Sequence, residues 1–87
     1  MAKKFIFDTE VWGALIGRCR ESIATDYGQD VPGLHELAEL LEVSRSCIDA
    51  WELRKYAEGF EHPNTTNILK VCNLAGFNPA DLWTMEG

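Results

Sequence analysis

Apolar residues recur every three or four positions in five stretches of the chain, which is the spacing of helices that bury one face. Residues that cap or end helices, such as Ser44 and Gly76, separate these stretches. The expected helices run from Asp8 or Thr9 to Tyr27, from Gly33 to Leu41, from Arg45 to Glu58, from about Asn64 to Gly76, and from Pro79 to Trp83. No stretch alternates polar and apolar residues for long enough to predict a strand. The pattern therefore predicts an all-α fold of five helices.

The length of the chain allows one core and no more. A chain of 87 residues buries only about 60–65% of its unfolded surface on folding, so nearly every apolar residue must serve the same core. A separate catalytic or effector-binding domain does not fit. We expect a single domain over residues 1–87, with 1–7 as a candidate flexible arm and 84–87 as a tail.

The second and third expected helices have the apolar spacing of a helix-turn-helix, in which two helices cross closely over a shared wedge. A small residue, Ala38, stands where the helices would approach most closely, and Val43 would fill the turn between them. The six positions that carry this pattern are Leu37, Ala38, Leu41, Val43, Ile48 and Trp51.

The stretch LAELLEVSRS at 37–46 resembles the motif of the phage repressor and Cro-type helix-turn-helix family, and the ending at 76–83 is similar to that family as well. The likeness covers roughly residues 10 to 83. Glu42 departs from it, because the family often has Gly in the turn, and the links at 26–32 and 53–63 are longer than usual. The resemblance implies a five-helix lambda repressor-like domain, and a phage or prophage transcriptional regulator that reads a palindromic operator as a homodimer.

The resemblance also implies that the third helix enters the major groove of double-stranded DNA. Its expected base-contacting residues are Arg45, Ser46, Asp49 and Ala50. Arginine can donate two hydrogen bonds to guanine, aspartate can accept one from cytosine, and alanine can pack on a thymine methyl. The alternative for Arg45 is an ordinary solvated surface arginine.

Phosphate contacts are expected from helix N-termini and from the other positive groups. The candidates are Ser44 at the start of the third helix, Arg54 and Lys55 near its end, and Lys3 and Lys4 in the arm. A disordered tail explains Lys3 and Lys4 equally well.

The resemblance further places Arg20, late in the first helix, beside Glu52, near the end of the third. A partly buried ion pair at this point would fix the angle between the two helices, and loss of one partner would leave an uncompensated charge.

The formal net charge of −6 favours a different partner from DNA, because non-specific DNA affinity comes from Lys and Arg that neutralise phosphates. Glu36, Glu39 and Glu42 also lie near the expected DNA side. The alternative function is therefore a protein-binding helix-turn-helix module, an antagonist or an antitoxin-like partner, that does not bind DNA itself.

Catalysis and metal binding find little support in the sequence. Cys19, Cys47 and Cys72 are widely spaced and fit apolar helix positions, so we interpret them as reduced core thiols. With His35 and His62 they have no zinc-site spacing. We expect no enzyme activity, no cofactor and no small-molecule substrate.

Both ends of the chain carry apolar residues that five short helices have little room for. We expect Phe5 to Phe7 and Leu82 to Met85 to form homodimer surfaces. Asp8 and Glu10 end the first apolar run far short of a signal peptide, so we expect a cytoplasmic protein with no membrane association.

Overall fold

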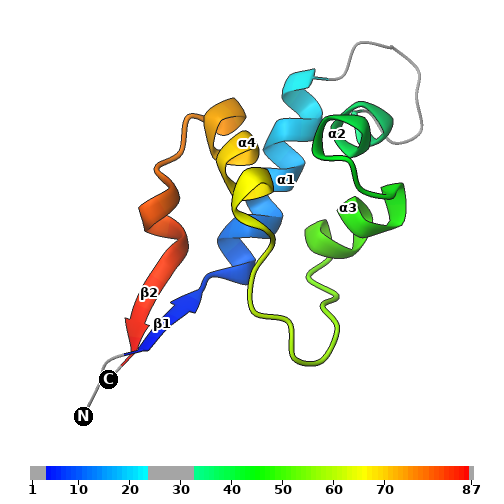
Figure 1. Cartoon of the computed structure of the whole chain (residues 1–87). Helices are drawn as coiled ribbons and strands as arrows, with labels where there is room; N and C mark the ends of the chain where they lie inside the picture. Colours follow the sequence, from blue (N-terminus) through cyan, green and yellow to red (C-terminus); the bar gives the residue numbers. More distant parts are fainter. Residues whose placement is uncertain (1–3, 24–32, 87) are drawn as a thin grey trace.

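The computed structural model describes residues 4–23 and 33–86 (Figure 1). Within them the chain forms four α-helices, one 3₁₀ turn and two short strands. In chain order these are β1 (Lys4–Phe7), α1 (Thr9–Ile23), α2 (Leu34–Leu41), α3 (Arg45–Glu52), α4 (Thr65–Ala75), η1 (Pro79–Leu82) and β2 (Trp83–Glu86).

Side-chain caps begin three of the helices where the sequence predicts them. The Asp8 carboxylate accepts a hydrogen bond from the amide of Val11 at 3.1 Å, at the start of α1. Ser44 and Asn64 accept in the same way from residues three positions later, at the starts of α3 and α4. Gly76 then ends α4 in the left-handed conformation. The expected end of the first helix at Tyr27 lies outside the described residues.

The core is built around α1, which packs against α2, α3 and α4. Trp12 of α1 meets Trp51 of α3 edge to face, with ring centroids 5.4 Å apart. The largest fully buried side chains are Trp12, Ile16, Cys19, Leu37, Ile48, Val71, Cys72 and Leu82. The helix α1 therefore forms the centre of the core and contacts each of the other three α-helices.

The prediction of an all-α, five-helix fold is wrong. The expected fifth helix is the single 3₁₀ turn η1, and the chain then continues as β2, which pairs antiparallel with β1. Phe5 lies opposite Met85 and Phe7 opposite Trp83. The residues of β1 do not alternate polar and apolar, and β2 lies almost a whole chain length away in sequence, so local spacing does not reveal the pairing.

The third helix is shorter than predicted, because α3 ends at Glu52 rather than at Glu58. The backbone of Arg54 turns into the left-handed region, with φ of 59°. Tyr56 then folds back, and its hydroxyl lies 3.3 Å from the carbonyl oxygens of both Thr9 and Trp51. The contact with Thr9, at the start of α1, favours a turn after Glu52. The residues from 53 to 58 could otherwise continue the helix.

Among the described residues, no helix combines the length and apolar character that crossing a membrane requires.

Candidate nucleic-acid interface

A three-residue turn joins α2 to α3. Glu42 takes the left-handed conformation, with φ of 56°, and ends α2. The amide of Val43 then donates to the carbonyl of Ala38 at 3.0 Å. Ser44 is extended and caps α3. The turn therefore closes without the glycine that the resemblance favours at position 42, at a cost of about 1–2 kcal/mol for a left-handed residue other than glycine.

The wedge expected between these helices is inside the protein. Leu37, Leu41 and Ile48 are buried, and so is the small Ala38. Trp51 is 8% exposed and closes the far end of the wedge, while Val43 packs on the core from the turn. The buried side of α3 therefore fixes the angle between α2 and α3. The opposite side of α3 faces solvent.

The start of α3 presents the residues expected to contact bases. Arg45, Ser46 and Asp49 are exposed and Ala50 is half-buried. The Ser46 hydroxyl donates to that of Ser44 at 3.4 Å. Within the described part of the chain, Arg45 makes no hydrogen bond or ion pair. Its guanidinium group is available to a ligand.

The residues expected to contact phosphates are not all brought together. Arg54 and Lys55 follow the end of α3, and the Arg54 guanidinium donates to Glu10 of α1 at 2.9 Å. Lys55 is exposed. Lys3 lies outside the described residues. Lys4 begins β1, which extends from the end of the molecule away from α2 and α3, so the structure does not bring Lys4 beside Arg45 (Figure 1).

Arg20 and Glu52 form a two-point ion pair between α1 and α3. Nε of Arg20 donates to one carboxylate oxygen at 2.9 Å and a terminal nitrogen donates to the other at 2.7 Å. The side chains are 17% and 26% exposed. This geometry holds the end of α3 against α1, as a bidentate arginine–carboxylate pair can.

Two glycines of α1 make room for this contact, and the sequence reasoning missed them. A Cβ at Gly13 would lie 3.1 Å from the carbonyl oxygen of Trp51, and one at Gly17 would lie 3.1 Å from the carboxylate of Glu52. Their spacing of four residues, which places them on one helix face, was the available signal. A side chain at position 13 would press on the backbone at the end of α3, whereas one at position 17 would press on the Glu52 carboxylate.

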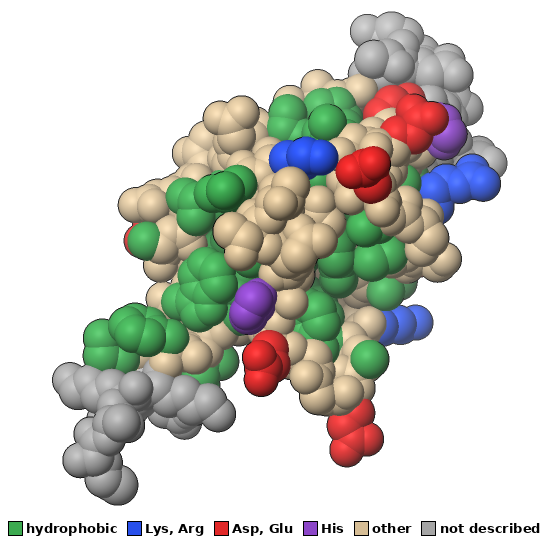
Figure 2. Space-filling model, in the orientation of Figure 1, with side chains coloured by type: hydrophobic (Ala, Val, Ile, Leu, Met, Phe, Trp, Pro, Cys, Tyr) green, Lys and Arg blue, Asp and Glu red, His purple; other side chains and the backbone are tan. Residues whose placement is uncertain are grey.

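Acidic side chains are exposed on α2 and on the turn that leads into α3. Glu39 and Glu42 are exposed on α2 and its turn, and Glu39 lies 3.4 Å from the ring of His35. Figure 2 shows basic and acidic side chains interspersed over this face of the described residues rather than a continuous basic surface. Any DNA affinity must therefore come from a few well-placed groups.

The cysteines lie in or against the core. Burial raises the pKa of Cys19 to about 11, and it raises the pKa of Cys47 at the start of α3 as well. A raised pKa keeps a thiol protonated and unreactive at neutral pH. Among the described residues, no three His, Cys, Asp or Glu side chains gather as metal ligands would.

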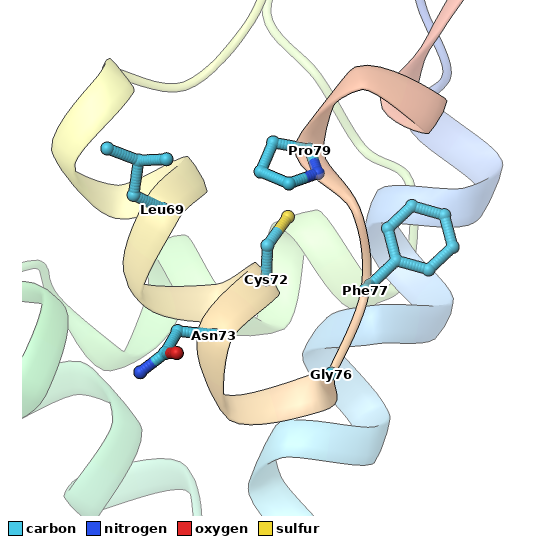
Figure 3. Close-up of a pocket in the computed structure, with 6 residues that line it drawn as sticks. All are labelled: Leu69, Cys72, Asn73, Gly76, Phe77 and Pro79. Carbon is cyan, nitrogen blue, oxygen red and sulfur yellow. The ribbon is translucent and has the colours of Figure 1, made fainter.

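A small hollow lies between α4 and η1, well separated in sequence from α2 and α3 (Figure 3). Leu69, Cys72 and Pro79 surround it, and its volume is about 370 Å³. Its lining contains no charged side chain.

Comparisons with protein-family models, curated proteins and solved structures found no match to this chain. Function has to be inferred from its own residues.

Proposed function

We propose that this protein is a sequence-specific DNA-binding transcriptional regulator of the phage repressor and Cro type, which inserts α3 into the major groove. One observation carries the proposal. The first half of α3 exposes Arg45, Ser46 and Asp49, while the buried wedge on the opposite side holds the helix in place.

Each exposed group has a base edge that it can read. Arg45 can donate two hydrogen bonds to O6 and N7 of guanine, and Asp49 can accept one from the amino group of cytosine. Ala50 can pack on a thymine methyl. Ser44 leads the N-terminus of α3, whose amides attract a phosphate. These roles match the direction in which α3 exposes its side chains.

The regulator would act as a homodimer on a palindromic operator. Two-fold dimers of helix-turn-helix proteins read half-sites about one turn of DNA apart, and the second half-site compensates for weak contacts at the first. With few positive groups near α3, a single copy would bind weakly. Such a protein works in the compartment that contains its operator, and we propose the cytoplasm.

A protein-binding module is the second candidate, and one contact favours it. Arg54, which would otherwise face phosphates from beside α3, is paired with Glu10. Together with the net charge of −6, this pair favours a partner that is not a polyanion. The exposed α3 face would then contact another protein.

A DNA titration separates the two candidates. The wild type is titrated at about 50 mM salt, where electrostatic contacts are strong, against a labelled duplex from upstream of its own gene. Arg45→Ala removes one bidentate base contact in each protomer, so at about 1–3 kcal/mol per contact the dimer should bind at least about 30-fold more weakly. Arg18→Ala is the matched control, because Arg18 is an exposed arginine on α1 and its loss changes the net charge equally.

Equal losses in the two variants would contradict base reading by Arg45. No binding by the wild type at this salt concentration would reject DNA binding and favour the protein-binding candidate.

A further inference from the structure

An aromatic hollow of about 490 Å³ lies at the end of the molecule that carries the two-stranded sheet. Residues of β1 and β2 form one side of it, and the segment between α3 and α4 forms the other. Its lining includes Phe5, Phe7, Phe60, Glu61, His62 and Trp83. Figure 2 shows hydrophobic side chains gathered at this end of the described surface. The volume falls within the range of small-molecule sites, about 300–1,000 Å³.

Inclined aromatic rings form much of this lining. The ring of Trp83 meets that of Phe7 at 72° and that of His62 at 67°, with centroids 5.2 and 6.0 Å apart. Phe60 adds a further ring from the segment before α4. Tyr56 stacks on one face of Phe60, at 4.5 Å between centroids, and leaves the other face for a ligand. The face of an aromatic ring carries partial negative charge, so such a lining attracts a positive group.

The polar side chains at the hollow also favour a cation. Glu61 is exposed, and among the described residues it makes no hydrogen bond or ion pair. Nδ1 of His62 lies 2.7 Å from the carbonyl oxygen of Pro63, which can only accept, so Nδ1 carries the hydrogen and Nε2 of the neutral ring is left as an acceptor. No lysine or arginine is among the described residues that line the hollow. A positive group therefore meets a carboxylate and an acceptor, whereas an anion would be repelled.

We propose that this hollow binds a small molecule through a quaternary or methylated ammonium group, without converting it. The rings attract the charge, and the Glu61 carboxylate adds to that attraction. Methyl groups take the place of N–H groups that would need water or an acceptor, so a methylated ammonium loses less hydration than a primary one among aromatic rings. The net charge of −6 gives a cation a further, weaker attraction to the protein.

The wall contributed by the segment before α4 is already held in place. The hydroxyl of Tyr56, whose ring stacks on Phe60, lies 3.3 Å from the carbonyl oxygen of Thr9, itself a lining residue. Pro63, which accepts from His62, is buried. On the other side, Phe7 is 6% exposed and anchors β1 in the core. A preformed site avoids the cost of ordering these side chains when a ligand binds.

A titration of the wild type with choline chloride, followed by backbone amide shifts in two-dimensional NMR spectra, tests this site. Choline carries the group with few other atoms, so we expect a dissociation constant of about 1–10 mM, with the largest shifts at 60–62 and at Trp83. The matched probe is the neutral isostere of choline, an alcohol in which a tert-butyl group replaces the trimethylammonium group. It should bind at least about 10-fold more weakly. Sodium chloride at the same concentrations controls for ionic strength.

Variants assign the binding to this hollow. Phe60→Leu removes one ring but keeps an apolar side chain, and should weaken choline binding about 2- to 30-fold, the range for loss of one cation–π contact. Glu61→Gln should weaken it about 2- to 5-fold, because an exposed carboxylate contributes modestly. Glu58→Gln is the matched control, since Glu58 is an exposed glutamate of the same segment that does not line the hollow. Its loss changes the net charge equally and should leave choline binding unchanged.

Four results would each overturn the cation site. The first is amide shifts no larger with choline than with sodium chloride, and the second is equal binding of choline and its neutral isostere, which would make the hollow merely apolar. The third is unchanged binding in Phe60→Leu, and the fourth is equal losses in Glu61→Gln and Glu58→Gln. None of these titrations contains DNA, so their outcome is independent of the role proposed for α3.

Discussion

A single residue, Gly33, determines how the start of α2 packs against α1. It precedes α2 with φ of 76°, a conformation that glycine adopts without strain. A Cβ at this position would collide with the backbone carbonyl of Arg20. The start of α2 therefore lies directly against the end of α1, and only glycine permits that approach.

Gly33→Ala should destabilise the protein by about 2–5 kcal/mol, because left-handed strain adds to an overlap with backbone that cannot rotate away. Urea unfolding measures the loss. Gly59→Ala is the control, since Gly59 also has a positive φ, 84°, but a Cβ there would meet nothing within 4 Å. The control should lose only about 1–2 kcal/mol. Equal losses would show that the close approach to Arg20 is unimportant.

Arg20→Met should lower the free energy of unfolding by about 1–3 kcal/mol, because the half-buried Glu52 carboxylate loses both charged hydrogen bonds. For a domain of this size, each kcal/mol lowers the melting temperature by roughly 4–8 °C. Arg54→Met is the matched control, because its pair with Glu10 is largely exposed, at 55% and 78%. Exposed pairs contribute at most about 1 kcal/mol. An unchanged melting temperature in Arg20→Met would remove the structural role of the pair.

Cys19 makes stability depend on alkaline pH. Burial raises its pKa from 9.0 to about 11, so between these values the folded protein keeps a proton that the unfolded chain releases. Stability is therefore fully present below pH 9 and falls as the pH rises toward 11, by about 1.4 kcal/mol per pH unit for this one group. Thermal melts of wild type and Cys19→Ala at pH 7–11 should show a shallower fall in the variant. Parallel curves would contradict the assignment to Cys19.

At the scale of elements, α3 depends on its first turn. Ser44 accepts a hydrogen bond from the amide of Cys47 at 3.1 Å, which satisfies one of the four amides that a helix leaves free at its N-terminus. The same turn carries Arg45 and Ser46, two of the residues proposed to contact bases. Fraying of this turn would destabilise the domain, and Arg45 would no longer be held in one position.

Ser44→Ala should cost about 1 kcal/mol of stability, the usual value for loss of a serine N-cap. Ser46→Ala, two residues later and also exposed, caps no amide and loses only the exposed 3.4 Å hydrogen bond to Ser44, so it should change stability by less than about 0.5 kcal/mol. Chemical denaturation of both variants checks the difference. Similar stabilities in the two variants would mean that solvent replaces the cap at no cost.

At the scale of the whole molecule, the charge distribution limits how DNA could be bound. Arg20 and Arg54 are engaged by carboxylates, and Lys70 donates to the carbonyl of Leu40. Arg45 and Lys55 are the positive groups near α3 that make no such contact among the described side chains. Specific base contacts must then contribute a larger share of the affinity than phosphate contacts do.

The salt dependence of DNA binding should accordingly be shallow. Because Arg45 is proposed to contact a base, Lys55 is left to neutralise one phosphate per protomer, about two in a dimer, which gives a slope of roughly −2 in a plot of log affinity against log salt concentration. Lys55→Ala should reduce the slope by nearly 2. Fluorescence anisotropy at several salt concentrations measures both slopes. A slope near −8 would indicate additional phosphate contacts from outside the described residues.

Local signals were sufficient where neighbours in sequence are neighbours in space. The caps at Ser44 and Asn64 and the glycine end of α4 follow from contacts within a few residues, and the α2–α3 wedge follows from apolar residues spaced three or four apart on each helix, which a linear pattern records. Tertiary contacts decided the rest. The pairing of β1 with β2 and the ion pair of Arg54 with Glu10 join segments more than 40 residues apart in the chain. The same holds for the contact of Tyr56 with Thr9 that accompanies the end of α3 at Glu52. Such contacts can override weak local propensities, and no spacing rule along the sequence contains them.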